Sequence, residues 1–293
     1  HLRSLDPEKL SPETGKKVSL AIRQVASVNQ FQGKPVEALA EFGRSRELLM
    51  RLHRKHPQDQ GLLFELGNAE YYVGNLHYSQ DRFDEALVSM QNYHRLTQQL
   101  SQLDPKNVDW ILEVSYSHNN LAAVRIDSGM GIDEETLAHV AEAIRLIEIV
   151  VDEKPEDEMV ASDYATTLAW AADAQYQACN IREAIGIRNK VRALSEFSLS
   201  KDPGNNDLKK QYAFALTGVA RLEVIVGQLV SARQNLESAV SILQQLSVED
   251  PSNIHYREEV LYRRVMLSQI IGDMGELDLS RSVDLRLTDI ECK

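Results

Sequence analysis

Apolar residues recur along the whole chain at the spacing of a helix rather than a strand. Leu236, Ala239, Val240 and Leu243, for example, are three, one and three residues apart, which places them on one helical face. No alternating run rich in Val, Ile and Thr predicts a strand. The pattern therefore predicts an all-α protein of about twelve long antiparallel helices.

Proline interrupts this pattern at a nearly fixed interval. Prolines stand at positions 7, 57, 105, 155, 203 and 251, so that successive ones are 48 or 50 residues apart. Because proline cannot continue a helix, each one predicts a helix end. A repeat of this length is typical of a helical solenoid. We expect one array of six repeats, which covers approximately residues 7–56, 57–104, 105–154, 155–202, 203–250 and 251–293.

Three further columns of residues keep the same register. One column falls in the middle of each unit: Gly33, Asp81, Gly129, Cys179, Gly227 and Gly275. Glycine and aspartate there suit a tight turn between helices. A small residue follows in the second helix: Ala38, Ala86, Thr136, Ala184, Ala232 and Ser280. A second small residue lies in the first helix, before the turn: Ala26, Gly74, Ala122, Ala172, Ala220 and Ser268. Since small residues let two backbones approach, each unit is predicted to be a closely packed helical hairpin.

Gly74, Asp81, Phe83 and Ala86 carry a resemblance to the tetratricopeptide repeat, at the offsets of its first-helix glycine, turn glycine, second-helix aromatic and second-helix alanine. The resemblance covers essentially the whole chain and implies a right-handed superhelical solenoid of six helix-turn-helix repeats. The usual repeat has about 34 residues. Seven extra residues in each helix, close to two turns, lengthen it without rotating its buried face.

Long-period arrays similar to this one are attached to bacterial multidomain signalling and defence proteins. HEAT-type repeats, with periods of about 40–47 residues, are the alternative fold, but they do not account for the glycine, alanine and proline offsets together. One family position departs from the pattern, because the expected first-helix aromatic is replaced by Asn29, His77, Arg125, Gln175, Glu223 and Ile271. We therefore expect different packing there.

Polar residues replace apolar ones in the last unit. Ser280 and Asp284 stand where the preceding unit has Ala232 and Leu236, as expected of a terminal capping helix. We expect the array to end near Lys293, with the rest of a larger protein upstream.

The formal charge of −12 excludes some classes of partner. Nucleic acid and anionic membranes both need a cationic surface, so neither is expected as the main ligand. No run approaches the ~18 apolar residues of a membrane span. We expect no membrane insertion of this fragment and a soluble protein, in the cytoplasm rather than the periplasm.

The sequence contains no recognisable catalytic or metal-binding motif. It lacks a phosphate-binding glycine loop, an HExxH sequence, a paired-cysteine zinc motif and a nucleophile elbow. His53 and His56 are separated by two cations, which favours a solvated helix end over a metal site, and Cys179 and Cys292 match no ligand spacing. No catalytic residue, cofactor or metal is predicted.

The tetratricopeptide resemblance implies a concave groove lined by the first helices, and its positions are rich in amides and aromatics. Amides bond an extended peptide, and Tyr and Trp provide large apolar contacts. The candidate groove residues are Asn68, Tyr71, Tyr72, Asn75, Tyr116, Asn119, Asn120, Trp170, Asp173 and Tyr176. For each aromatic, a place in the core is the alternative.

The family's clamp for C-terminal carboxylates is approximated only by Arg23 and Asn75 and is not predicted. The function that we expect is a non-enzymatic scaffold or sensor module that binds a protein or peptide, within a larger bacterial regulatory, signalling or defence protein. Self-assembly into a homo-oligomer is the alternative, and an enzyme is the least favoured class.

Overall fold

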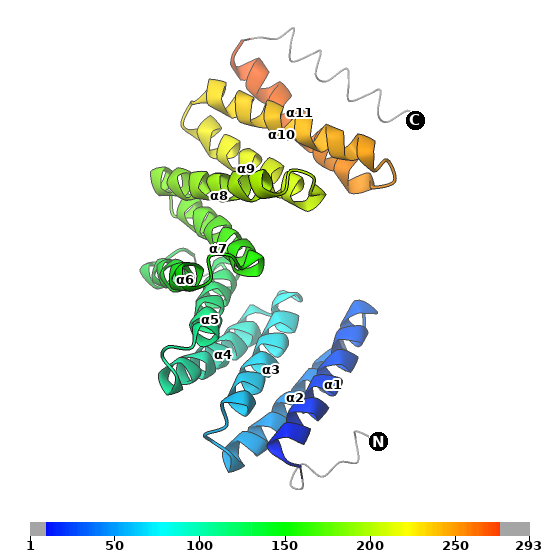
Figure 1. Ribbon diagram of the computed structural model, residues 1–293, viewed down its shortest axis with the longest axis vertical. Helices are drawn as coiled ribbons and strands as arrows, with labels where there is room; N and C mark the ends of the chain where they lie inside the picture. Colours follow the sequence, from blue (N-terminus) through cyan, green and yellow to red (C-terminus); the bar gives the residue numbers. More distant parts are fainter. Residues whose placement is uncertain (1–9, 130, 276–293) are drawn as a thin grey trace. The chain divides into compact units, whose positions relative to one another are not determined.

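A computed structural model describes residues 10–129 and 131–275 of the chain, and this part contains eleven α-helices and no strand (Figure 1). The helices are α1 (Pro12–Phe31), α2 (Pro35–Lys55), α3 (Gln60–Tyr78), α4 (Phe83–Leu103), α5 (Val108–Asp127), α6 (Glu134–Glu153), α7 (Glu158–Gln177), α8 (Ile181–Lys201), α9 (Asn206–Ile225), α10 (Leu229–Glu249) and α11 (Ile254–Asp273). The all-α prediction is confirmed. The twelfth predicted helix, with Ser280 and Asp284, lies outside the described residues.

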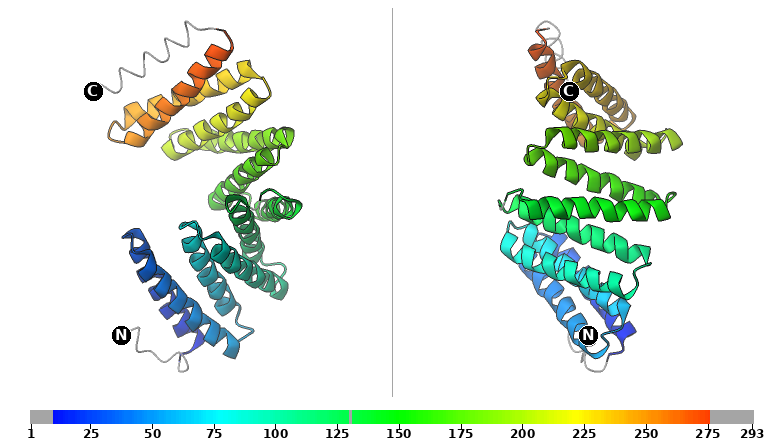
Figure 2. Two further views of the ribbon diagram at one scale, coloured as in Figure 1. Left: turned by 180° about the vertical axis from the view of Figure 1, so that it is seen from behind. Right: turned by 90° about the vertical axis from the view of Figure 1, so that its left-hand side faces the viewer.

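The chain divides into two compact units between Val160 and Ala161. In the first unit, α1 packs on α2, α3 on α4 and α5 on α6, while α2–α3 and α4–α5 join successive hairpins. In the second unit, α9 packs on α8 and on α10, and α10 packs on α11. Consecutive helices fold back on each other within each unit, as Figure 2 shows from two further sides.

The turn within each hairpin uses one residue in the left-handed region. Gly33 has φ 70°, and its N–H donates to the carbonyl oxygen of Gln30 at 3.0 Å. The same region is occupied at every predicted turn position: Gly33, Asp81, Gly129, Cys179, Gly227 and Gly275. Glycine adopts this conformation without a Cβ penalty, which explains its dominance. The predicted turn column is confirmed, with Asp81 (φ 57°) and Cys179 (φ 61°) as its non-glycine members.

The turns between hairpins pair a proline with a capping side chain. Pro57 lies between α2 and α3, and Asp59 accepts a hydrogen bond from the backbone N–H of Leu62 at 2.9 Å. Asn107 and Asn205 cap α5 and α9 in the same way, two residues after their prolines. The recurring proline and Asx residue therefore end one helix and start the next.

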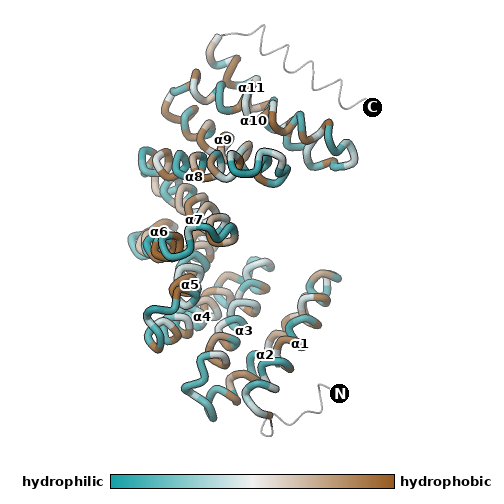
Figure 3. The backbone as a smooth tube through the Cα atoms, in the orientation of Figure 1, coloured by the Kyte–Doolittle hydropathy of each residue, from teal (hydrophilic) through white to brown (hydrophobic). Residues whose placement is uncertain are grey.

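Small residues lie at the contact between the two helices of a hairpin. Ala38, Ala86, Thr136, Ala184 and Ala232 have no exposed surface. A Cβ added to Gly74 would lie 3.0 Å from Ser89 Cβ, so glycine is needed for this approach of α3 to α4. Apolar residues recur along the described helices (Figure 3), and those members of the small columns that the structure describes are buried as predicted.

Candidate binding surface of the first helices

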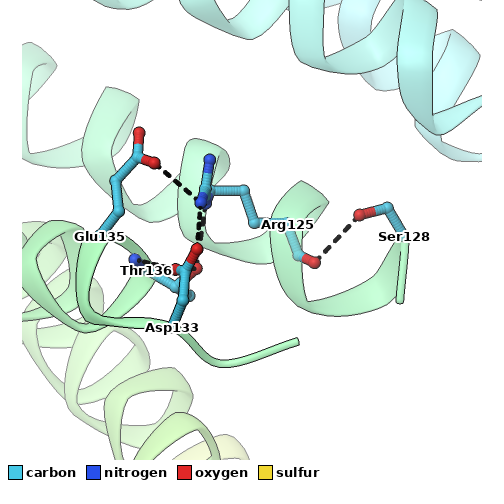
Figure 4. Close-up of polar contacts among 5 residues, drawn as sticks. All are labelled: Arg125, Ser128, Asp133, Glu135 and Thr136. Atoms are coloured by element: carbon cyan, nitrogen blue, oxygen red, sulfur yellow. Dashed lines mark hydrogen bonds and ion pairs between the residues drawn. The ribbon is translucent and has the colours of Figure 1, made fainter. Parts of the chain in front are cut away.

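In the tetratricopeptide pattern the first helix carries an aromatic at the position that Arg125 occupies here. Arg125 instead makes hydrogen bonds and ion pairs across its hairpin. Arg125 on α5 donates to Thr136 Oγ1 at 3.0 Å and pairs with Asp133 at 2.6 Å and Glu135 at 2.8 Å (Figure 4). The backbone N–H of Thr136, then its hydroxyl and Arg125, lower the pKa of Asp133 to about 2. Arg125 therefore ties the end of α5 to the start of α6.

The same position in the second unit is Glu223 on α9. Its carboxylate accepts hydrogen bonds from Ser231 Oγ at 2.6 Å and Asn235 Nδ2 at 2.8 Å on α10. Glu223 is buried, and these two donors satisfy its oxygens. At Arg125 and Glu223, charged groups with partners across the hairpin therefore take the place of a ring, as expected from the sequence, whereas Ile271 packs in an apolar cluster.

In the first unit, the predicted aromatics divide between the surface and the core. Tyr72 is 36% exposed and stacks on Phe42 of α2, with ring centroids 5.3 Å apart and an angle of 9° between the planes. Tyr71 instead packs on Tyr93 at 5.7 Å, in a cluster with Met90 and Leu121. The guanidinium carbon of Arg23 also lies 5.6 Å from the centroid of Tyr72. Tyr72 thus keeps part of its ring exposed between Phe42 and Arg23, whereas Tyr71 contributes mainly to the core.

The predicted amides of the first unit lie half-buried on α3 and α5. Asn68, Asn75 and Asn119 belong to this group. Asn120 uses its Nδ2 to donate to the backbone oxygen of Tyr116 at 2.7 Å, one turn earlier in the same helix. Its amide oxygen still has acceptor capacity, since a side-chain amide carries both functions.

In the second unit, the three predicted residues come from α7. Trp170 is 49% exposed and Tyr176 is 39% exposed. The carboxylate of Asp173 pairs with the guanidinium of Arg188 on α8 at 2.5 Å. All three side chains are therefore accessible on this helix.

A cleft of about 290 Å³ opens in the second unit, and two of the three predicted residues of α7, Asp173 and Tyr176, line it. Asp173, Arg221 and Gln269 line it from equivalent positions of α7, α9 and α11. Five of its twelve lining residues are apolar: Leu222, Val224, Ile225, Met266 and Ile270. Tyr176, Arg188, Gly218 and Asp273 complete the lining. Apolar walls with a few polar groups are typical of a binding site.

Arg188 is a residue of this cleft that the first-helix positions do not predict. It comes from α8, a second helix, and reaches the cleft beside Gly218. The sequence signal is Gly218 itself, because the equivalent residues of earlier repeats are the larger Tyr72, Asn120 and Trp170. A gap at this position admits a side chain from the neighbouring helix.

Two exposed rings continue the same helical faces toward the N-terminal ends of α9 and α11. Phe214 precedes Gly218 and Arg221 by four and seven residues, so these three share one face of α9. Tyr262 has the same relation to Met266 and Gln269 on α11. The rings are 37% and 53% exposed.

Arg263 fixes the positions of both rings. Its guanidinium carbon lies 4.6 Å from the centroid of Phe214 and 6.0 Å from that of Tyr262. The side chain is almost fully buried, and its Nε donates to Thr217 Oγ1 at 2.7 Å. The cation–π contacts and this hydrogen bond hold Phe214 and Tyr262 as a preformed aromatic shelf.

Comparison with known proteins gives likenesses in structure only. No family model matches the sequence, and no curated protein matches it. The S. pombe nuclear import adaptor Nro1 superposes with a TM-score of 0.64 at 11% identity, over 97% of this chain and 94% of Nro1. BtubC from P. vanneervenii has a TM-score of 0.60 at 17% identity, over 86% of this chain and 89% of BtubC.

A third similar structure contains the nearly identical TPR-like repeats of a kinesin light chain type protein from Podosopora anserina. Its TM-score is 0.56 at 16% identity, over 79% of this chain and 97% of that one. This chain has the tetratricopeptide-like repeat fold. In this fold α7, α9 and α11 are the first helices of their repeats. They carry the aromatic shelf and the cleft, to which α8 adds Arg188. No helix among the described residues of the tetratricopeptide-like chain is long and apolar enough to span a membrane.

Proposed function

We propose that this chain is a non-enzymatic scaffold that binds a protein or peptide on its first helices. The observation that supports the proposal most strongly is the cleft of the second unit, which lies on the same faces of α9 and α11 as Phe214 and Tyr262. An extended peptide crossing α9 and α11 would place apolar side chains on the shelf and one side chain in the cleft. Exposed, preformed aromatic rings are the usual anchors of such interfaces.

Arg221 gives the cleft a preference for a partner of particular charge. Among the described residues it makes no hydrogen bond or ion pair, whereas Arg188 is paired with Asp173. A guanidinium bonds a carboxylate through two parallel N–H groups, so we expect Arg221 to bind an acidic group of the partner, on the side of the cleft away from the carboxylate of Asp273. The bound segment is therefore expected to carry an acidic residue between apolar ones.

The proposal is tested by selecting peptides from a random displayed library on the wild-type chain. The selected peptides should be enriched in an acidic residue next to aromatic or aliphatic ones. Arg221→Glu should weaken their binding by about tenfold or more, since it replaces an ion pair with repulsion. Arg257→Glu, an equal charge change at an exposed site of α11 that does not line the cleft, should leave the affinity unchanged. Equal losses in both variants would show a general charge effect and reject the site.

Self-assembly is a second candidate, favoured by the exposed apolar residues of α1. Leu20, Val28 and Phe31 are 47%, 55% and 94% exposed. Apolar residues gathered on one helix mark interaction surfaces. Light scattering over a range of concentrations tests this function. A mass that rises with concentration, and does not rise in Phe31→Ser, supports it, whereas a constant monomer mass excludes it.

Following the resemblance of its repeats, we further propose that the chain belongs to a larger bacterial regulatory, signalling or defence protein. Its part would be to recognise the partner, while another region of the same protein carries out the response.

A further inference from the structure

Two apolar positions of α1 are exposed although the equivalent positions of later first helices are buried. Val25 and Val28 are 47% and 55% exposed. Their equivalents in α3, 48 positions later, are Val73 and Leu76, which are 3% and 2% exposed. The same two positions are also buried in α5 and α11, where they are Leu121, Val124, Leu267 and Ile270. Thus α1 keeps the apolar residues of a helix contact that the described part of the chain does not supply.

At three junctions, the second helix of the preceding hairpin covers these positions. Val73 and Leu76 of α3 share a cluster with Ala38 and Phe42 of α2. Matching pairs from α4 and α10 pack with the two positions of α5 and α11: Ala86 with Met90, and Ala232 with Leu236. Each pair is a small residue followed four positions later by a large apolar one, on one helix face. In α8 the second member is Arg188, which extends into the cleft.

The sequence that precedes α1 matches the end of a second helix. Leu5-Asp6-Pro7 has the same residues as Leu103-Asp104-Pro105, and α4 ends at Leu103. Likewise, α10 ends directly before Asp250-Pro251. The match is one of sequence, since residues 5–7 lie outside the described part of the chain. It favours a second helix in the polypeptide upstream.

A second copy of the chain fits this face of α1 less well. Head-to-tail stacking would bring the second helix of the last unit onto α1, and its two positions in the sequence are Ser280 and Asp284. Asp284 stands at the position of Leu236. A carboxylate against Val25 and Val28 would be desolvated, which is costly unless it is paired.

We propose that the face of α1 around Val25 and Val28 binds a second helix of the upstream polypeptide, packed as α2 packs on α3. That helix should carry a small residue and, four positions later, a large apolar one. The small residue should stand 18 residues before Asp6, as Ala86 does before Asp104. This inference rests on the proposal that the chain belongs to a larger protein, and it names the element that adjoins α1.

The test measures how fast Val28→Cys reacts with a maleimide. The substitution is made in the 293-residue chain and in a longer chain that adds the natural upstream residues, about one repeat in length. Mass spectrometry of the α1 peptide reports the labelling separately from Cys179 and Cys292. In the longer chain the labelling rate of Val28→Cys should fall by about tenfold or more, because a buried thiol reacts only through local opening.

Ser27→Cys supplies the matched control on the same helix. Ser27 is exposed, and its equivalents in later repeats, Asp173, Arg221 and Gln269, stay exposed. Its labelling rate should therefore be the same in both chains. Equal rates for Val28→Cys in the two chains, or equal slowing of Ser27→Cys, would overturn the proposal.

A dilution series of the 293-residue chain tests a second copy on the same face. Protection of Val28→Cys that increases with concentration would show self-assembly there and would overturn the proposal. An upstream sequence that lacks the small and large apolar pair would overturn it too. If upstream residues are present but leave Val28→Cys reactive, this inference fails while the proposal of a larger protein stands. Peptide binding to the cleft of the second unit is measured separately and does not depend on either result.

Discussion

Gly218 and Arg188 approach so closely that a larger residue at position 218 displaces the arginine. A Cβ added to Gly218 would lie 3.2 Å from Arg188 Cδ and 3.3 Å from its Nη1. Arg188 is also the partner of Asp173. The size of residue 218 therefore controls the shape of the cleft on α7, α9 and α11.

Gly218→Tyr should close this cleft, since it introduces the kind of residue that Tyr72 represents in an earlier repeat. We expect the affinity for a selected peptide to fall by about tenfold or more, as for loss of an interface anchor, measured by isothermal titration calorimetry. Gly186→Tyr is the matched control, because an added Cβ there meets no atom within 4 Å. The cleft would be the wrong site if Gly218→Tyr bound normally or if both variants lost affinity equally.

Arg125→Ala should destabilise the first unit through the α5–α6 hairpin. The substitution removes bonds to Thr136, Asp133 and Glu135 by a side chain that is 12% exposed. We expect the free energy of unfolding to fall by about 2 kcal/mol, measured by urea denaturation.

The control for this change is Arg145→Ala. Arg145 is 56% exposed and pairs with Glu142 in its own helix. Its removal should cost at most about 0.5 kcal/mol. Equal losses in the two variants would contradict the assigned role of Arg125.

His118 and His139 should make the first unit sensitive to acid. Their Nδ1 atoms are 2.8 Å apart, so one ring must be neutral to accept the proton of the other, and His94 lies 4.5 Å from His118 between ring centroids. Burial lowers the pKa of His94, His118 and His139. The charges of His94 and His139 lower the pKa of His118 further, to about 4. Glu142 and Glu135 oppose these shifts, while Arg145 and Arg125 add to them.

The direction in which pH changes the free energy of unfolding follows from proton binding by the folded and unfolded states. An unfolded histidine titrates near 6.5, so between about 6.5 and about 4 the unfolded chain binds more protons than the folded one. The stabilisation from His118 is present above pH 6.5 and is lost as the pH falls toward 4. Lowering the pH from 7.5 to 5 should cost the wild type up to about 2 kcal/mol more than His118→Gln in urea denaturation. His255→Gln, at an exposed site, should follow the wild type; if His118→Gln did so too, the cluster would not be the sensor.

Cys179→Gly should stabilise the second unit. Cys179 has φ 61° at a turn where four of the other five predicted positions carry glycine. Removing the Cβ relieves the left-handed penalty, for a net gain of about 0.5–1 kcal/mol after the entropy cost of glycine. A thermal melt should show a higher Tm for Cys179→Gly and no increase for Cys179→Ala. An equal increase in both would point to the thiol rather than the backbone.

The sequence was sufficient for features that depend on local chemistry. The turn residues from Gly33 to Gly275 and the buried alanine column were predictable because φ preference and side-chain size act within one hairpin. The same register placed Asp173 and Tyr176 on the first-helix side. Their common cleft with Arg221 follows from equivalent positions in successive repeats.

The remaining features depend on contacts between helices and could not be predicted from spacing. Arg188 enters the cleft from a second helix only because Gly218 leaves room. Tyr71 and Tyr72 are neighbours in sequence, yet only Tyr72 keeps a substantial exposed surface, since Tyr93 and Met90 pack on Tyr71. The bonds of Arg125 and Glu223 across their hairpins likewise became evident only from the structure.

Photocrosslinking from position 176 tests the central claim most directly, that the first-helix cleft of the second unit binds a peptide. A benzoylphenylalanine in place of Tyr176 should crosslink a selected peptide, whereas the same residue in place of Phe197, exposed on α8, should not. Crosslinking at position 197 with none at position 176 would contradict the account.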